Sequence, residues 1–105
     1  MRTDDKKHRA HNILITRVLE GDGTATAAQR RAAFDNARLN EPLSTLVNKV
    51  TRYAYRVTDE DVASVKASGF SEDQIFELVI CAALGQSTRQ YESALAALDA
   101  ASEKE

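Results

Sequence analysis

The sequence predicts an all-α fold of about five helices, and three observations favour it. Apolar residues recur at intervals of three and four along much of the chain, which is the spacing of one helix face. No segment alternates polar and apolar residues as a half-buried strand would. The single proline and three of the four glycines fall between the candidate helices, where chain breaks are expected.

The first expected helix covers residues 8–20 and ends at Gly21-Asp22-Gly23, because glycines permit backbone angles that other residues resist. Thr24 or Thr26 is then expected to cap a second helix that extends to about Leu39. This second helix is rich in alanine, whose small side chain buries little area. We therefore expect this part of the chain to be held loosely, or to fold against a partner subunit.

Pro42 marks the start of a third helix, since a proline is tolerated in the first helical turn. The helix is expected to run to Val57 with basic and polar residues on its other side. Its apolar stripe has the 3.6-residue period of a single buried face. The stripe consists of Leu43, Leu46, Val47, Val50, Tyr53, Ala54 and Val57.

Thr58 and Asp61 resemble a capping box at the start of a short fourth helix. Gly69 is well placed just after this helix, where a left-handed backbone is needed. Ser71 and Gln74 form a second capping box. A tight corner is therefore expected between the fourth helix and the fifth.

The fifth helix is expected from Glu72 to about Ala100. Its first part, residues 75–84, is apolar on nearly every side, which indicates burial on several sides. Its second part narrows to a seam at positions 84, 87, 91, 94 and 98, which suits packing along another helix. Four short helices can hardly cover the apolar part, so we expect identical copies of the chain to associate.

With 105 residues the chain is long enough for one domain, residues 1–105, with N-terminal helices in 1–40 and a core in 41–100. No transmembrane run or signal-type segment is evident, and the one cysteine forms no internal disulfide, so a cytoplasmic location is expected. The charge is uneven, at +5 for residues 1–56 and −7 for residues 57–105. The basic half leaves a nucleic-acid or acidic partner open, although no known binding pattern is present.

The corner carries a family resemblance. A helix ending in Ala-x-Gly-Phe followed directly by Ser-x-x-Gln-Ile is similar to the core of the alkylhydroperoxidase D-like, or carboxymuconolactone decarboxylase-like, superfamily. The resemblance covers about residues 43–98 and implies an oligomeric helical bundle. The residues that carry it are Ala67, Gly69, Phe70, Ser71, Gln74, Ile75, Glu77 and Val79.

The peroxidase branch of that family carries Cys-x-x-Cys-x-x-x-His on the helix before the corner. When the corner is aligned, the two cysteine positions fall on Ala54 and Val57 and the histidine position on Asp61. Alanine and valine have no redox chemistry, and an aspartate is a poor substitute for a histidine base at neutral pH. Glu41 lies near the family's upstream glutamate with a register offset of about one residue. The chain is therefore expected to be a divergent member without disulfide-cycling peroxidase activity.

Four residues of the fifth helix are candidates for remaining chemistry: Glu77, Cys81, Arg89 and Tyr91. Glu77 lies one turn before Cys81 and can in principle accept a thiol proton, but burial would make the thiol inert. Arg89 and Tyr91 are candidates for polar groups of a cleft or of a subunit contact. His8 and His11 lack a third ligand at a firm spacing, so neither a metal nor a cofactor is expected.

Three functional hypotheses follow. The first is a homo-oligomeric structural, regulatory or ligand-binding protein without redox chemistry. The second is an enzyme, either a one-cysteine peroxidase using Cys81 and Glu77 or a decarboxylase-like enzyme with Glu77, Arg89 and Tyr91 in an intersubunit cleft. The third is a nucleic-acid or acidic-partner binder. The sequence names no substrate or ligand and leaves enzymatic activity open.

Overall fold

The computed structural model describes residues 2–103, with side chains from residue 6 onward, and this part of the chain is all-α. It contains helices α1 (Arg2–Glu20), α2 (Ala27–Asp35), α3 (Leu43–Arg52), α4 (Asp59–Ala67) and α5 (Glu72–Glu103), with a short 3₁₀ helix, η1 (Ala54–Arg56). The described residues contain no strand. The predicted fold class and number of helices are therefore confirmed.

Two caps at the corner of α4 and α5 form as the sequence predicts. The Thr58 hydroxyl accepts from the Asp61 amide while the Asp61 carboxylate accepts from the Thr58 amide. Ser71 and Gln74 make the same reciprocal pair of bonds at the start of α5. Gly69 lies between the two helices with φ of 114°, which side chains rarely permit.

Several predicted helix boundaries are wrong. The first helix begins at Arg2 and not at residue 8. The second ends at Asp35 and not at Leu39, because Asn36 adopts a left-handed conformation and donates its N–H to the carbonyls of the last turn. The fifth helix extends past Ala100 to Glu103.

The third helix stops at Arg52, so its predicted continuation to Val57 is also wrong. Tyr53 leaves the helical conformation with φ of −144°, and η1 follows it. Tyr53 is 45% exposed and Ala54 is exposed, so neither belongs to the buried stripe. Leu43, Leu46 and Val47 of the stripe are buried as predicted, whereas Val50 and Val57 are only partly buried.

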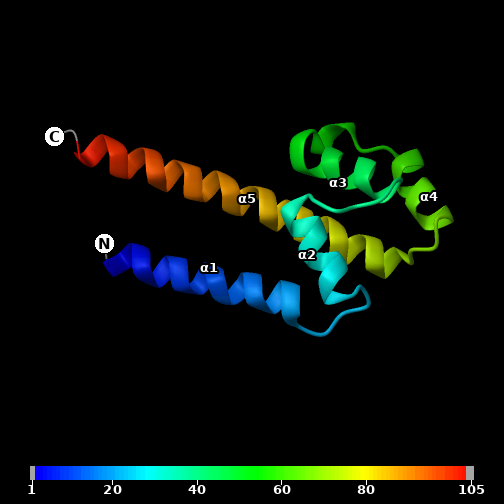
Figure 1. Ribbon diagram of the computed structural model, residues 1–105, viewed down its shortest axis with the longest axis horizontal. Helices are drawn as coiled ribbons and strands as arrows, with labels where there is room; N and C mark the ends of the chain where they lie inside the picture. The colour runs from blue at the N-terminus through cyan, green and yellow to red at the C-terminus, as the bar shows by residue number, and fades with distance from the viewer. Residues whose placement is uncertain (1, 104–105) are drawn as a thin grey trace.

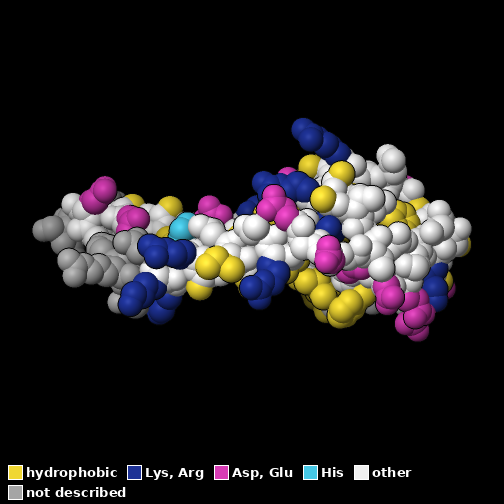
Figure 2. Space-filling view, turned by 90° about the horizontal axis from the view of Figure 1, so that it is seen from below, with side chains coloured by type: hydrophobic (Ala, Val, Ile, Leu, Met, Phe, Trp, Pro, Cys, Tyr) yellow, Lys and Arg dark blue, Asp and Glu magenta, His cyan; other side chains and the backbone are white. Residues whose placement is uncertain are grey.

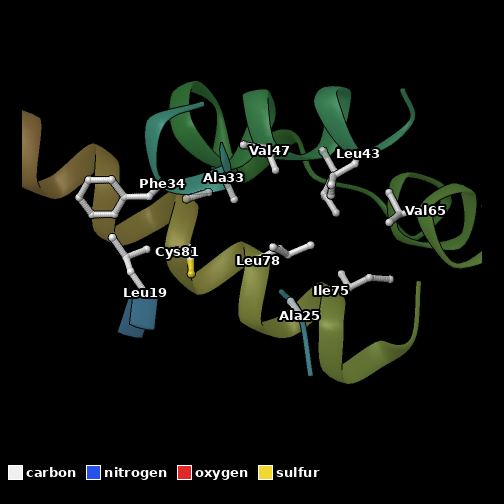
Figure 3. Close-up of a cluster of buried hydrophobic side chains, with 12 residues drawn as sticks. Leu19, Ala25, Ala33, Phe34, Leu43, Val47, Val65, Ile75, Leu78 and Cys81 are labelled. Atoms are coloured by element: carbon white, nitrogen blue, oxygen red, sulfur yellow. The ribbon is translucent and has the colours of Figure 1, made fainter. Parts of the chain in front are cut away.

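The core lies where α2, α3 and α4 surround the first half of α5 (Figure 3). Leu78 and Cys81 of α5, Leu46 and Val47 of α3, and Val65 of α4 are almost completely buried. Gly85 of α5 allows α2 to approach closely, because a Cβ at this glycine would lie 1.9 Å from the carbonyl oxygen of Phe34. Small residues at this crossing therefore fix how α2 lies on α5.

The second half of α5 leaves this core and runs beside α1, so that both ends of the chain lie at the same end of the molecule (Figure 1). His11 of α1 contacts Thr88 and Tyr91 of α5 in this two-helix arm. The molecule measures 55 × 29 × 20 Å, with a radius of gyration of 15.9 Å. A compact domain of this length has a radius of gyration of about 13 Å, so the arm makes the chain markedly elongated.

Candidate functional site

The structure separates the four candidate residues of α5 into three places. Glu77 and Cys81 line a groove beside the end of α1. Arg89 lies against the end of α2, and Tyr91 lies against His11 of α1. Glu77 and Cys81, which the sequence predicts to lie close together, therefore line the same groove. Arg89 and Tyr91 are not among the residues that line it.

The groove has a volume of about 370 Å³ and lies between the end of α1, the α1–α2 loop and the first half of α5. We call it the α1–α5 groove. Its apolar lining comes mainly from α5, and its charged lining comes from all three segments. The lining residues are Arg17, Val18, Asp22, Gly23, Thr24, Arg30, Asp73, Phe76, Glu77, Ile80 and Cys81.

Glu77 holds the α1–α2 loop onto α5. Its carboxylate accepts from the backbone N–H of Thr24 at 2.9 and 3.0 Å, from the Thr24 hydroxyl, and from the N–H of Ala25 at 3.3 Å. Gly23 leaves space for this carboxylate, since a Cβ there would lie 2.3 Å from the Glu77 Oε1 and would force the Glu77 side chain to shift. The Thr24 hydroxyl and these amides lower the pKa of Glu77 below its ordinary value. Such a carboxylate is a weak base at neutral pH, and its contacts describe an anchor.

Arg30 of α2 closes the bottom of the groove and is only 7% exposed. Its Nη1 donates to the carbonyl oxygens of Val18 at 2.9 Å and Gly21 at 2.7 Å, which are the free carbonyls at the end of α1. A buried cation needs such partners to offset its loss of hydration. Arg30 and Glu77 therefore fix the turn between α1 and α2 from opposite sides.

The thiol of Cys81 lies inside the core and is 0% exposed. Burial raises the pKa of Cys81, with the neighbouring Glu77 charge adding to the effect and Arg30 opposing it. Reactive cysteines combine exposure with a lowered pKa, and Cys81 has neither property. The geometry describes a small apolar filler of the core.

Large apolar side chains stand exposed beside the α1–α5 groove. Phe76 is 66% exposed and Ile80 is 40% exposed, one helical turn apart on α5. A second hollow, lined by Ile13 among others, shares Arg17 with the groove and continues along α1. Ile13 is 55% exposed, and Figure 2 shows hydrophobic side chains in separate groups on the face that carries α1. Exposed apolar side chains are therefore present on both α5 and α1, in separate groups.

Arg89 and Tyr91 have mainly structural contacts. Arg89 donates from Nη1 to the carbonyl oxygen of Phe34 at 2.8 Å and from Nη2 to the Gln86 Oε1 at 3.3 Å. The ring of Tyr91 lies 5.7 Å from the ring of His11. These contacts join α5 to α2 and to α1 within one chain.

The sequence did not predict the partners of Glu77 or the contact between His11 and Thr88. Nothing in the spacing of Thr24 or Arg30 indicates that they meet Glu77 across the fold, because they lie roughly fifty residues away along the chain. The one usable signal is Gly23, a glycine just before a threonine in a turn, which leaves space for a carboxylate. The contact of His11 with Thr88 had no sequence signal at all.

Within the described residues, no cluster of three or more His, Cys, Asp or Glu side chains has a metal-binding arrangement. No helix in that same part of the chain has the length and apolar character to cross a membrane. No family model matches the sequence, and neither a curated protein nor a solved structure is significantly similar to it, so these comparisons assign the chain to no family.

Proposed function

We propose that this protein is a self-associating helical protein whose copies pair through the α1–α5 groove, with a structural or ligand-binding role in place of redox chemistry. The proposal rests on the solvent-accessible surface of the chain, which is larger than that of a compact monomer of the same mass. The chain exposes 7411 Å². A compact monomer of 11.5 kDa exposes about 5,800 Å², so this chain has about 1,600 Å² more. A standard interface removes about 800 Å² from each partner, which is well within this surplus.

The chemistry of the groove suits a second copy of the same chain. Phe76 and Ile80 supply an exposed apolar centre, and aromatic residues are enriched at the centres of interfaces. Arg17 lies on the α1 side of the groove and Asp73 on the α5 side. In a two-fold pair each copy presents the same patch to the other, and an axis that runs along the groove would place Arg17 of one copy opposite Asp73 of the second. Opposite charges at the rim then favour one orientation.

The alkylhydroperoxidase D-like assignment belongs to the same proposal. The helix order and the corner at Gly69, with its capping boxes, support it. The positions aligned with the family's redox motif support a non-redox role. Ala54 is exposed on η1, and the Asp61 carboxylate is 2.8 Å from Lys49 Nζ. The hydrogen bond from Lys49 lowers the pKa of Asp61, which makes this carboxylate a weak base for a proton relay.

The enzyme hypotheses remain predictions without a supporting observation. Glu77 is an anchored carboxylate with a lowered pKa, and Cys81 is a buried thiol with a raised pKa. The nucleic-acid hypothesis likewise gains no specific contact from the described residues. We therefore give precedence to self-association.

The mass of the protein in solution tests the proposal. Light scattering after size exclusion, over a range of concentrations, is expected to give a multiple of 11.5 kDa. Phe76→Lys places a charge at the apolar centre and should shift the mass toward a single chain. Tyr55→Lys is the matched control, because Tyr55 is 80% exposed but lies on η1, outside the groove. A single 11.5 kDa species at the highest soluble concentration would contradict the proposal.

A charge exchange tests the orientation of the pair. Arg17→Asp should weaken association by placing two acidic residues opposite each other. Arg17→Asp combined with Asp73→Arg should restore it, because the pair of charges is only reversed. Failure of the double variant to recover, with each single variant still folded, would reject this orientation.

A further inference from the structure

A second polar cavity lies outside the α1–α5 groove and shares no residue with it. It has a volume of about 390 Å³ and lies where the ends of α2 and α3 meet the middle of α5. We call it the α2–α3–α5 cleft. Its lining residues are Asp35, Asn36, Thr51, Arg52, Gln86 and Arg89.

Hydrogen-bond donors predominate in this cleft. Arg89 is held in place by its bonds to the carbonyl oxygen of Phe34 and to Gln86. Since the Oε1 of Gln86 accepts from Arg89, its amide nitrogen is left as a donor. Arg52 is exposed at the last turn of α3 and adds a second guanidinium. Two permanent cations and a neutral donor therefore face one small space.

Thr51 adds an unusual feature. Its side-chain oxygen is buried and has no hydrogen-bond partner among the described residues. Burying a hydroxyl without a partner is costly, and most such groups in proteins are satisfied. Thr51 lines the cleft, and a threonine in a helix has two accessible rotamers, so the site requires the rotamer that directs this hydroxyl toward the cleft. A ligand oxygen in the cleft would then supply the missing partner.

The backbone carbonyls that would repel an anion here already accept hydrogen bonds, and the cleft lining holds more cations than acids. The carbonyls at the end of α2 accept from the N–H groups of Asn36 and Ala37 and from Arg89. Asp35 is the single acid of the cleft, and its carboxylate lies 3.4 Å from Arg31 Nε. The cleft is therefore locally positive, although the chain as a whole has a net charge of −2.

We propose that the α2–α3–α5 cleft binds a small oxyanion, a phosphate or carboxylate group, through Arg52 and Arg89, with Gln86 and Thr51 as neutral donors. Arginine presents paired N–H groups that match the oxygens of both anions. The proposal does not depend on self-association, because no residue of the cleft belongs to the α1–α5 groove.

The test is a titration of the full chain with inorganic phosphate and, separately, with acetate, followed by ¹H–¹⁵N NMR. Saturable shifts are expected at the amide of Thr51, the side-chain amide of Gln86 and the Nε–H of Arg89. The anion that saturates at lower concentration identifies the group that the cleft prefers. Shifts that grow linearly with either salt and never saturate would overturn the proposal.

Variants separate this site from general charge attraction. Arg52→Gln changes an exposed side chain, so the variant should remain folded, and its affinity for the anion should fall about tenfold. Thr51→Val should lower the affinity for the anion less, because this substitution removes a neutral donor. Arg56→Gln is the matched control, since it removes the same charge from η1, outside the cleft, and should leave affinity unchanged. Equal losses in Arg52→Gln and Arg56→Gln, or no loss in Arg52→Gln, would reject the site.

Discussion

At the end of the molecule where α2, α3 and α4 surround α5, seven apolar side chains are less than 2% exposed. Along the arm, His11 of α1 contacts Thr88 and Tyr91 of α5, and apolar side chains such as Ile15, Leu84 and Leu95 are only partly buried. Among the arm residues whose side chains are described, Leu19 and Thr88 are the buried ones, and Leu19 belongs to the hydrophobic core cluster. The core end is therefore densely packed, whereas the arm has few buried side chains and exposes most of its surface. An arm of this kind gains most from a second copy.

The largest expected difference between the two ends comes from removing a leucine side chain. Leu78→Ala should lower the free energy of unfolding by about 3–4 kcal/mol, because Leu78 is 0% exposed and leaves a cavity. Leu95→Ala in the arm should cost about 1 kcal/mol, since its side chain already meets solvent. Urea unfolding at one protein concentration measures both. Equal losses would show that the arm is as well packed as the core.

A second comparison uses two glycines with different roles. Gly85→Ala should cost about 2–3 kcal/mol, because the new Cβ would lie 1.9 Å from the backbone oxygen of Phe34 and force α2 away from α5. Gly69→Ala meets open space and should cost about 1 kcal/mol, from its φ of 114° alone. Thermal unfolding of both variants checks the order. A larger loss at Gly69 would place the strain in the corner and not in the helix crossing.

Much of the fold was predictable from sequence because its signals are local. Capping boxes at Thr58 and Ser71 and the glycine at Gly69 act within one or two helical turns, so spacing alone reveals them. The stop at Arg52 was not predictable in this way. The stripe continues in helical register through Tyr53, but the chain turns into η1 there, and the ring of Tyr53 packs instead against Tyr55 and Arg56.

The candidate site was predictable only in its α5 residues. Glu77 and Cys81 lie one turn apart on a helix, so their proximity follows from the sequence. The roles of both residues depend on segments that are distant in sequence. Thr24 and Ala25 tie up the Glu77 carboxylate, and the surrounding helices bury Cys81. Arg89 likewise takes its role from the end of α2, which it meets only after folding.

The α1–α2 loop, which Glu77 holds onto α5, gives a prediction that depends on pH. The Thr24 hydroxyl and the amides of Thr24 and Ala25 favour the ionised Glu77, so its pKa in the folded chain lies below its ordinary value of 4.5. Its contribution to stability is therefore fully present above pH 4.5 and is lost as the pH falls through the lower folded pKa. Glu77→Gln should cost about 1 kcal/mol at neutral pH, where the charged acceptor is lost.

Unfolding free energies measured from pH 7 downward separate this effect from general acid sensitivity. The difference between the natural chain and Glu77→Gln should shrink below pH 4.5, where protonation removes the charge from the natural chain as well. Asp61, whose pKa is lowered mainly by its hydrogen bond to Lys49, titrates in both proteins and so does not contribute to the difference. A difference that stays constant to low pH would show that Glu77 does not anchor the loop through its charge.

The smallest expected effect concerns the link between α1 and α5. The Thr88 hydroxyl donates to the carbonyl oxygen of Leu84 at 2.7 Å, so it accepts the hydrogen bond from His11 Nε2 at 2.8 Å. Thr88→Val keeps the side-chain shape and removes both bonds. The unfolding free energy should fall by only about 0.5 kcal/mol, because water can replace the partner of the partly exposed His11. Amide exchange in α1 should nevertheless become faster.

Ser87→Ala separates the link between helices from a local helix effect. Ser87 also donates to the carbonyl oxygen of Leu84, at 3.1 Å, but its side chain is exposed and it has no hydrogen bond to α1. This variant should leave exchange in α1 unchanged, while Thr88→Val accelerates it without affecting α3. If both variants accelerate α1 equally, the arm is held by the helix backbone of α5 and not by the contact with His11. If neither does, packing of Ile15 and Val18 on α5, or a second copy of the chain, holds α1 in place.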